Sequence, residues 1–489
     1  MKHLIKPSIA AMAAMILPTL ANAQYVVKTV SGPNQKLTGD IAAISENGWV
    51  GGSFTPAGST TGHIGIWNYN SGLFEDLGAF PSGATTMSVF AVNTSGQVLA
   101  AGSTGYYVYA IGAKPVKLPT FPATTGPTFT EAFAMNDAGM VVGDSNLGPF
   151  VFQNGNFKVL AGVNAFCIND SGIVGGNTGP TVFGGPNPTA VLWNDAGAMV
   201  WQLLSFPASI MAINSFGTAA GLQGVNNLPF VASGSTLTEM GNAPGSVIDN
   251  QFITGIDDSG HVAGYAWLPN LVPYPYIWYQ GTYTNLNSIA TLPNKDKISG
   301  PGGIDIYGRM LVYGTIDNEA YGYVLIPPII VTTSASPAGA GHLQGYGGYT
   351  SGQTMQFSAT PFSGYFFNNW TLNGSVVSEE ASFSVKAAKS EALVANFTAA
   401  SLSLANPTIV GGAGDVAKIS LGAPAPRELT FRVSSSNPHA TVPAGPIYIA
   451  AGATSVTFNV KTTAVTADTA VTIAASGDAS MTAKLTIAP

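Results

Sequence analysis

The sequence predicts an all-β protein: a seven-bladed β-propeller followed by two small β domains, one β-grasp or sandwich-like and one immunoglobulin-like. First, one hairpin motif recurs seven times within residues 24–327 with a mean period of about 43 residues, in the range of propeller blades. Second, 59 Gly, 32 Pro and only 8% charged residues favour short strands joined by tight turns. Third, 46% hydrophobic residues can fill several cores, which argues against disorder.

The N-terminus has the pattern of a secretory signal peptide. Lys2 and Lys6 form a basic segment, Pro7 to Leu20 an apolar one, and Ala21-Asn22-Ala23 a cleavage site of small residues. We therefore expect residues 1–23 to be removed and the mature protein to be extracellular or periplasmic. A membrane anchor is the alternative, but the apolar stretch is short for a bilayer. The rest of the sequence contains no run of about 18 apolar residues, so we expect no transmembrane segment there.

The mature chain is acidic and has one cysteine. Without Lys2 and Lys6 it has 15 basic and 24 acidic residues, a net charge of −9. This balance argues against nucleic acid and anionic membranes as partners. Cys167 cannot form an intrachain disulfide, so sheet packing must stabilise the fold. Because other copies of the repeat have Ala or Gly at this position, we interpret Cys167 as a small buried core residue rather than a reactive thiol.

Each copy of the repeat has the pattern of a β-hairpin. It consists of a small residue, an aliphatic residue, a polar turn ending in Gly, and a second run of β-forming residues. The Asn, Asp or Ser that opens the turn can bond to the following backbone, and Gly takes the left-handed conformation that closes it. A second hairpin follows in each unit and gives the four strands of one blade. The copies begin at Ala43, Ala91, Ala134, Cys167, Ala212, Gly255 and Gly303.

The seventh unit lacks its last strand, because Pro327 and Pro328 directly follow Tyr321 to Ile326. Tyr25 to Val30 precedes the first copy, where the last strand of a preceding blade would lie. We expect this segment to pair with residues 321–326 and close the ring, which would remove an exposed sheet edge. An open solenoid, which shares the repeat signature but needs capped ends, is the structural alternative.

The seven copies resemble the HAF repeats of bacterial extracellular proteins, and the resemblance covers residues 24–327. It implies an exported protein. The repeat pattern carries no catalytic residue that could be transferred to this chain.

Two segments of different character follow. Residues 328–399 contain Gly364-Tyr-Phe-Phe-Asn-Asn-Trp370 and resemble the divergent bacterial repeat related to the B-repeats of internalins, which implies a small β-grasp or sandwich domain. Tyr365 and Trp370 could form a sugar-stacking platform, but a very small domain favours a role in its core. Residues 400–489 alternate with period two and are interpreted as an immunoglobulin-like sandwich without a disulfide. Such modules act as spacers or adhesive units.

No motif predicts a catalytic, metal or cofactor site. Asn169-Asp-Ser-Gly and Asp257-Asp-Ser-Gly look like pieces of calcium loops, but they lack the alternating carboxylates and the closing acidic residue. We interpret both as turns capped by a side chain. The His residues lack the spacing of a zinc site. The acidic residues of the repeats are assigned to the turns rather than to acid–base chemistry; they are Glu46, Asp137, Asp170, Asp257, Asp258 and Asp305.

The candidate binding face is the one opposite the repeated turns, because long connections gather there and binding residues concentrate on loops held by a rigid scaffold. Trp267, Tyr274 and His63 are the candidate ligand-binding residues on it, with ordinary loop packing as the alternative for each. The long connections are residues 55–63, 122–129, 177–188, 268–274 and 292–301.

The sequence therefore predicts a secreted or cell-surface, non-catalytic binding or adhesion protein, a monomer that recognises an extracellular glycan or protein. One alternative is a carbohydrate-active propeller enzyme, a glycosidase or lyase with an unrecognised carboxylate site. Another is a purely structural envelope protein. Three acidic side chains converging at the central opening would favour the enzyme, and an apolar or Gly-lined opening would favour the binding protein.

Overall fold

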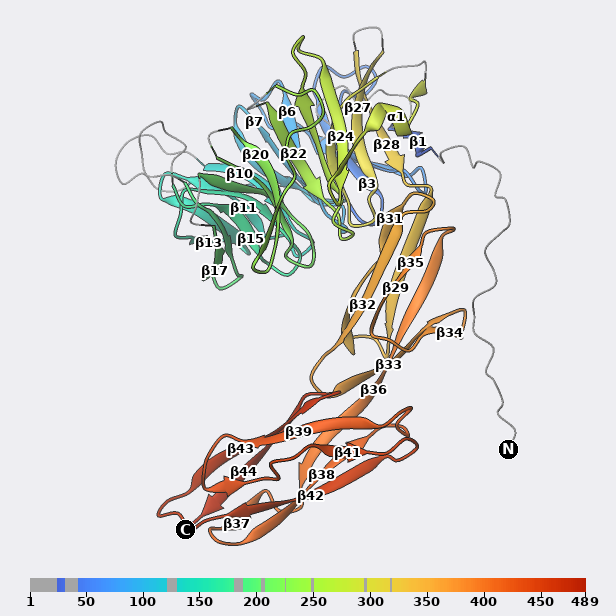
Figure 1. The fold of residues 1–489 in the computed structure, drawn as a ribbon. Coiled ribbons are helices and arrows are strands. Elements are labelled where there is room, and N and C mark those ends of the chain that lie inside the picture. The colour runs from blue at the N-terminus through green and yellow to red at the C-terminus, as the bar shows by residue number, and fades with distance from the viewer. Residues whose placement is uncertain are drawn as a thin grey trace, which may run out of the picture.

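The computed structural model describes residues 24–30, 43–120, 130–179, 188–203, 207–224, 226–247, 250–293, 297–316 and 319–489. The predicted signal peptide, residues 1–23, lies outside this part of the chain. The described residues form an all-β structure, as predicted, and α1 (Leu286–Ile289) is the one α-helix among them. Figure 1 shows a ring of sheets built from residues 26–326 and, extending from one side of it, a stalk built from residues 329–488.

The described part of the ring consists of seven antiparallel sheets of four strands each. In sheets 1 to 6 the strands are neighbours in chain order, as two successive hairpins require. Sheet 1 contains β2 (Ala43–Ile44), β3 (Trp49–Phe54), β4 (His63–Asn68) and β5 (Phe74–Ala79), and sheet 2 contains β6 (Met87–Val92), β7 (Val98–Gly102), β8 (Gly105–Tyr109) and β9 (Val116–Lys117). Sheet 3 contains β10 (Thr130–Met135), β11 (Val141–Ser145), β12 (Gly148–Gln153) and β13 (Asn156–Val159).

The next three sheets repeat this order. Sheet 4 contains β14 (Asn164–Ile168), β15 (Val174–Asn177), β16 (Ala190–Trp193) and β17 (Met199–Gln202). Sheet 5 contains β18 (Ala208–Ile213), β19 (Ala219–Gln223), β20 (Leu228–Ser233) and β21 (Thr236–Glu239). Sheet 6 contains β22 (Gln251–Ile256), β23 (Val262–Trp267), β24 (Pro273–Tyr279) and β25 (Thr282–Asn285).

Sheet 7 joins the two ends of the ring. It contains β26 (Ile298–Ile304), β27 (Met310–Ile316), β28 (Glu319–Ile326) and, from the N-terminus, β1 (Val26–Thr29). β1 pairs antiparallel with β28, with Val26 opposite Ile326 and Thr29 opposite Tyr323. The predicted pairing of residues 25–30 with 321–326 is thus confirmed.

The sheets are arranged in a closed circle, because the first strand of each contacts the first strand of the next, and β26 of sheet 7 contacts β2 of sheet 1. Each of the seven junctions has its own apolar core. Between sheets 7 and 1, Leu311 and Val324 pack with Val50 and Phe54. An open stack would leave the first and last sheets apart, so the solenoid alternative is excluded.

The repeated turns have the predicted chemistry. Gly139 and Gly172 have φ angles of 72° and 77°, in the left-handed region that Gly adopts without strain. Asn136 opens its turn and caps it, because its Oδ1 accepts a hydrogen bond from the Met140 amide at 2.9 Å. Cys167 is buried in the core between sheets 4 and 5, as predicted, and burial raises the pKa of its thiol to about 12.

The stalk has two cores that share one long strand, β36. The core nearer the ring includes Trp370, which is fully buried and packs against Phe357 and Phe383, so its predicted core role is confirmed. The strands around this core are β29 (Ile329–Ser336), β30 (Gly341–Gln344), β31 (Gly347–Tyr349), β32 (Thr354–Pro361), β33 (Tyr365–Leu372), β34 (Ser375–Ser378), β35 (Ser382–Lys386) and β36 (Glu391–Leu404).

The second core lies between the end of the eight-stranded sheet that contains β36 and a separate five-stranded sheet. β36 runs without a break through residues 399 and 400, the expected domain boundary. The remaining strands are β37 (Thr408–Val410), β38 (Gly414–Leu421), β39 (Leu429–Ser435), β40 (Ala440–Thr441), β41 (Ile447–Ile449), β42 (Ser455–Thr462), β43 (Thr469–Gly477) and β44 (Met481–Ala488).

Candidate functional site

The first strands of the seven sheets enclose a central channel, which the repeated motif lines in successive rings. The small residue that begins each copy forms one ring. This residue must be small because neighbouring first strands approach closely: a Cβ at Gly255 would lie 2.6 Å from the side chain of Ile304. The aliphatic residue that follows forms the next ring, which consists of Ile44, Val92, Met135, Ile168, Ile213, Ile256 and Ile304. The polar turns follow at one end of the channel, which we call the turn end.

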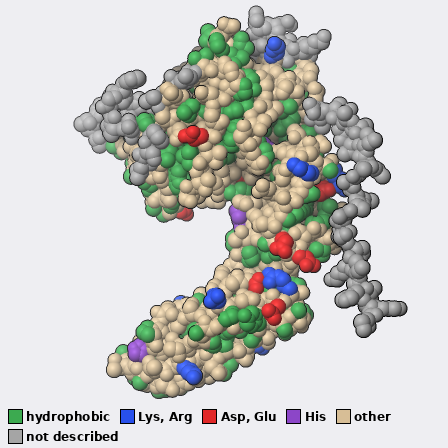
Figure 2. Space-filling view, in the orientation of Figure 1, with side chains coloured by type: hydrophobic (Ala, Val, Ile, Leu, Met, Phe, Trp, Pro, Cys, Tyr) green, Lys and Arg blue, Asp and Glu red, His purple; other side chains and the backbone are tan. Residues whose placement is uncertain are grey.

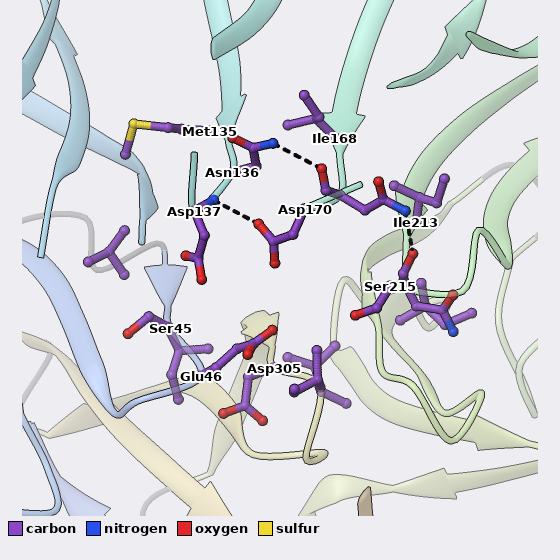
Figure 3. Close-up of a pocket in the computed structure, with 17 residues that line it drawn as sticks. Ser45, Glu46, Met135, Asn136, Asp137, Ile168, Asp170, Ile213, Ser215 and Asp305 are labelled. Carbon is purple, nitrogen blue, oxygen red and sulfur yellow. Dashed lines mark hydrogen bonds between the residues drawn. The ribbon is translucent and has the colours of Figure 1, made fainter. Parts of the chain in front are cut away.

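Asparagines join neighbouring sheets at the turn end. Asn136, which caps its own turn with Oδ1, also donates from Nδ2 to the carbonyl of Asn169 in the next sheet at 3.1 Å (Figure 3). Asn169 donates to the carbonyl of Asn214 at 2.9 Å, and Asn214 donates to that of Asp257 at 3.0 Å. A side-chain amide offers both an acceptor and donors, so Asn can cap one turn and bond to the next at once.

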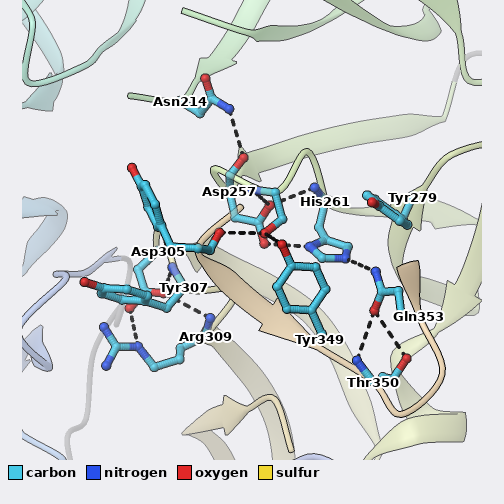
Figure 4. Close-up of polar contacts among 12 residues, drawn as sticks. Asn214, Asp257, His261, Tyr279, Asp305, Tyr307, Arg309, Tyr349, Thr350 and Gln353 are labelled. Carbon is cyan, nitrogen blue, oxygen red and sulfur yellow. Dashed lines mark hydrogen bonds and ion pairs between the residues drawn. The ribbon is translucent and has the colours of Figure 1, made fainter. Parts of the chain in front are cut away.

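Sheets 6 and 7 have Asp in place of this Asn, each with a basic residue four positions later. Asp257 Oδ2 lies 2.7 Å from Nδ1 of His261, and Asp305 Oδ2 accepts from Nε of Arg309 at 2.6 Å (Figure 4). Arg309 also donates to the carbonyl of Glu46, which links sheet 7 to sheet 1. Burial raises the pKa of Asp305 to about 6, although Arg309 favours its ionised form.

Carboxylates surround the opening at the turn end. Glu46, Asp137, Asp170 and Asp305 line a cavity of about 170 Å³ there (Figure 3). Asp137 accepts from the Thr94 amide at 2.8 Å and from its hydroxyl at 2.6 Å, and Asp170 accepts from the Asp137 amide at 2.7 Å. The turns therefore engage these two carboxylates, but the bonds run between sheets rather than within one turn.

The prediction that the turns engage all the acidic residues of the repeats is wrong for Glu46. Within the described part of the chain its carboxylate has no hydrogen bond, and it faces the opening (Figure 3). Burial, followed by the negative charges of Asp170, Asp137, Asp258 and Asp305, raises the pKa of Glu46 to about 7. A carboxyl group with this pKa can take up or release a proton at neutral pH.

The wall of the opposite, loop end of the channel is aromatic, apolar and rich in Gly. A bulge interrupts the first strand of sheets 2 to 6, and the bulged residues line a second cavity of about 280 Å³. Because a bulge takes a residue out of the ladder, its side chain can turn toward the axis. The bulged residues are Phe90, Phe133, Phe166, Met211 and Thr254. The channel thus has both kinds of opening that the sequence analysis distinguished, one acidic and one apolar.

The three sequence-predicted site residues lie near the loop end but not together. His63 begins β4 in sheet 1, where its Nδ1 lies 2.9 Å from both carboxylate oxygens of Asp76. Trp267 and Tyr274 belong to sheet 6, and sheet 7 lies between that sheet and sheet 1. Tyr274 is paired with Ala266, so its side chain and that of Trp267 lie on opposite faces of the sheet. Residues 122–129, 180–187 and 294–296 of the long connections lie outside the described residues.

Trp267 instead belongs to an aromatic run that the sequence analysis missed. Its ring lies 6.1 Å from that of Tyr265, which stacks on Phe252 at 4.7 Å with an interplanar angle of 15°. Phe252 is 40% exposed and stands two residues before channel-lining Thr254 on the innermost strand. The i, i+2 spacing of Tyr265 and Trp267 was visible in the sequence, but the partner across the strands depends on register.

Among the described residues, no helix is long and apolar enough to cross a membrane, and His, Cys, Asp and Glu form no group of three suited to hold a metal ion.

Comparison with known proteins identifies one segment. Residues 331–401 match the family model described as the divergent InlB B-repeat domain, which confirms the resemblance predicted for this segment. No curated protein matches the chain. A similar solved structure is the β-propeller domain of the Trilobed protease from Pyrococcus furiosus, at 8% identity and a TM-score of 0.36, covering 51% of this chain and 81% of that one. A mutant of Salmonella alpha-2-macroglobulin has 10% identity and a TM-score of 0.15, and the match covers 96% of this chain and 40% of that one. At these scores neither likeness carries an argument.

Proposed function

We propose that residues 24–327 form a seven-bladed β-propeller of HAF repeats, the recognition platform of an exported, non-catalytic protein that binds an extracellular glycan. Seven four-stranded sheets, the contact between β26 and β2, and the pairing of β1 with β28 support this architecture. Residues 328–399 and an immunoglobulin-like sandwich at 400–489 act as spacer or attachment units. The signal-like pattern of residues 1–23 supports export to the cell surface or periplasm.

The aromatic run of Phe252, Tyr265 and Trp267 carries the proposal. Sugar rings stack on aromatic faces, and the exposed ring of Phe252 stands beside the Phe-lined loop end of the channel. On the face of the ring that Figure 2 shows, charged side chains are few and scattered over a largely uncharged surface, whereas several gather in the stalk. Such a surface suits an uncharged glycan better than a charged polymer.

A glycan array probed with the full-length protein tests the proposal. Trp267→Ala and Phe252→Ala should each weaken binding by about ten-fold, since each removes a stacking surface worth roughly 1 kcal/mol or more. Tyr448→Ala is the matched control, because Tyr448 is a 50% exposed aromatic residue of the stalk. Binding to no glycan, or the same loss in the control variant, would contradict the proposal. Capture of a purified protein partner without any glycan would favour the protein-binding alternative.

The carboxylates at the turn end favour a second candidate function, a glycosidase or lyase. Glu46, with its raised pKa, would act as the general acid there. A reducing-sugar assay over a panel of polysaccharides, with Glu46→Gln as the test variant, separates the two functions. The exposed Glu131 of β10 provides the control Glu131→Gln. Turnover abolished only by Glu46→Gln supports the enzyme. Turnover that is absent or unchanged by this substitution contradicts it, and absence of both binding and turnover favours a structural envelope protein.

A further inference from the structure

The stalk contacts the ring beside the carboxylate opening at the turn end. The loop between β30 and β31 lies against the turns of sheets 5, 6 and 7. Tyr346 in this loop donates to the Asp258 carboxylate, and its ring lies 5.6 Å from that of Phe216 and 6.1 Å from that of Tyr307. Ser259 Oγ donates to the carbonyl of Tyr346 at 3.0 Å. The stalk is therefore docked through specific polar contacts.

A chain of hydrogen bonds crosses this contact through His261, which is 4% exposed (Figure 4). On the ring side, its Nδ1 lies 2.7 Å from Asp257 Oδ2. On the stalk side, its Nε2 lies 2.7 Å from Nε2 of Gln353. Gln353 Oε1 in turn accepts from the Thr350 amide at 3.0 Å and from the Thr350 hydroxyl at 3.3 Å.

These partners define where His261 carries its proton. The Thr350 amide can only donate, so the oxygen of Gln353 must face it and the Gln353 amino group must face the imidazole. His261 Nε2 then accepts a hydrogen bond, and the proton resides on Nδ1, which donates to Asp257. A second proton, on Nε2, would point at an N–H donor, so the docked stalk has no acceptor for it.

We propose that His261 is a pH-sensitive latch: protonation of its Nε2 breaks the bond to Gln353 and loosens the docking of the stalk on the ring. Asp257 belongs to the same turn and faces the imidazole whether or not the stalk is docked, so its attraction for the imidazolium does not oppose release. Only the bond to Gln353 depends on docking, and its loss couples proton uptake to opening.

The other titratable groups around His261 do not reverse this coupling. The ring of Tyr279 from β24 lies 4.4 Å away and that of Tyr349 from β31 lies 6.2 Å away. Burial raises the pKa of both phenols, and that of Tyr25 near Asp257, so all three stay neutral in acid. Asp258 accepts from Tyr346 and has a pKa raised by burial, so its protonation would weaken docking in the same direction.

Hydrogen exchange of the full-length protein measures this opening, because amides at the contact exchange when the stalk undocks. The amides of residues 345–350 should exchange about five-fold faster, after correction for intrinsic chemistry, at pH 5.5 than at pH 7.5. Loss of one hydrogen bond corresponds to a change of this size. Amides of β42 in the second stalk core serve as the internal reference, and His439→Gln controls for an exposed histidine elsewhere.

Two substitutions of Gln353 distinguish the latch from a general effect of acid. Gln353→Leu removes the bond to His261, so the contact should already be looser at pH 7.5. The exchange rate of these amides should then rise less than two-fold in acid. Gln353→Glu places an acceptor opposite Nε2, so protection at pH 5.5 should equal or exceed that at pH 7.5. The proposal is overturned if the unsubstituted protein shows no change with pH, or if either variant keeps the five-fold change, which would assign the effect to Asp258.

Discussion

Replacing Asn136 with Asp tests whether the turn asparagines hold the ring together. The substitution keeps the oxygen that accepts from the Met140 amide, so the turn itself retains its cap. It replaces the amino group that donates to the carbonyl of Asn169 with a second oxygen. Asn136 is 4% exposed and Asn169 is 6% exposed, so water cannot easily take over the lost bond.

The expected cost follows from these contacts. A neutral hydrogen bond contributes about 1 kcal/mol. The Asn169 carbonyl keeps its bond from the Gly172 amide at 3.0 Å, so the larger cost falls on the introduced carboxylate oxygen, which is buried without a donor at a cost of about 1–3 kcal/mol. The free energy of unfolding should therefore fall by roughly 2–4 kcal/mol at pH 7. Burial should raise the pKa of the introduced carboxyl above its ordinary value of about 4, and the protonated form can donate again. At pH 3.5 the cost should shrink to about 1 kcal/mol.

Urea unfolding followed by tryptophan fluorescence measures this cost, because fully buried Trp193 lies in the core between sheets 3 and 4 that Asn136 bridges. Asn154→Asp is the control, since Asn154 is exposed in an outer turn of the same sheet. The double variant Asn136→Asp/Met140→Arg copies the pair of Asp305 and Arg309 and should recover at least 1 kcal/mol. Equal costs for Asn136→Asp and Asn154→Asp, or a cost that does not change with pH, would refute the reasoning.

Three further predictions concern other parts of the ring. The raised pKa of Glu46 means that its ionisation opposes folding, so stability present below pH 4.5 is lost as pH rises toward 7. In urea titrations, the free energy of unfolding of the unsubstituted protein should be about 1 kcal/mol lower at pH 7.5 than at pH 4.5, after allowance for the partial exposure of Glu46. Glu46→Gln should abolish this difference, and the same pH dependence in both proteins would contradict the prediction. Lys28→Pro removes the amide proton of β1 opposite Val324. It should lower the free energy of unfolding by roughly 1–3 kcal/mol and speed the aggregation that light scattering measures, whereas Lys28→Ala should change neither. Equal effects of the two substitutions would show that β1 does not hold the ring. Cys167 should react with a chromogenic disulfide reagent at pH 8 only after unfolding in urea, because burial holds its thiol protonated; rapid reaction in the native state would exclude the core role.

The parts of the fold that depend on local chemistry could be predicted from the sequence. The turns follow from Asn or Asp at the first position and Gly at the fourth, as Asn136 and Gly139 show. The closing strand follows from a different argument, since a unit of three strands leaves an edge that residues 25–30 can cover. The buried position of Trp370 follows from the size of its domain, because a small core relies on large aromatic residues, as the neighbouring Phe357 and Phe367 show.

The acidic opening was not predicted, because each carboxylate was considered only in its own turn. Glu46, Asp137 and Asp170 occupy the second turn position in their copies of the repeat. Once a repeat of about 43 residues closes into a ring, equivalent positions meet around one axis. The signal was therefore present in the sequence as acidic residues at one motif position in several copies. Which of them lacks a partner depends on contacts between sheets that only the structure shows.

The docking of the stalk explains why some copies depart from the repeat pattern. At the third turn position, copies 1 to 4 have Asn47, Ser95, Ala138 and Ser171, whereas copies 5 and 7 have Phe216 and Tyr307. Both of these aromatic rings lie against Tyr346 of the stalk. Asp replaces the capping Asn only in copies 6 and 7, and in copy 6 the Asp positions the histidine that reaches Gln353. Contact with the stalk thus accounts for Phe216, Tyr307 and the Asp257–His261 pair, whereas Asp305 and Arg309 link sheet 7 to sheet 1. Departures from a repeat pattern can therefore indicate which side of a ring is occupied.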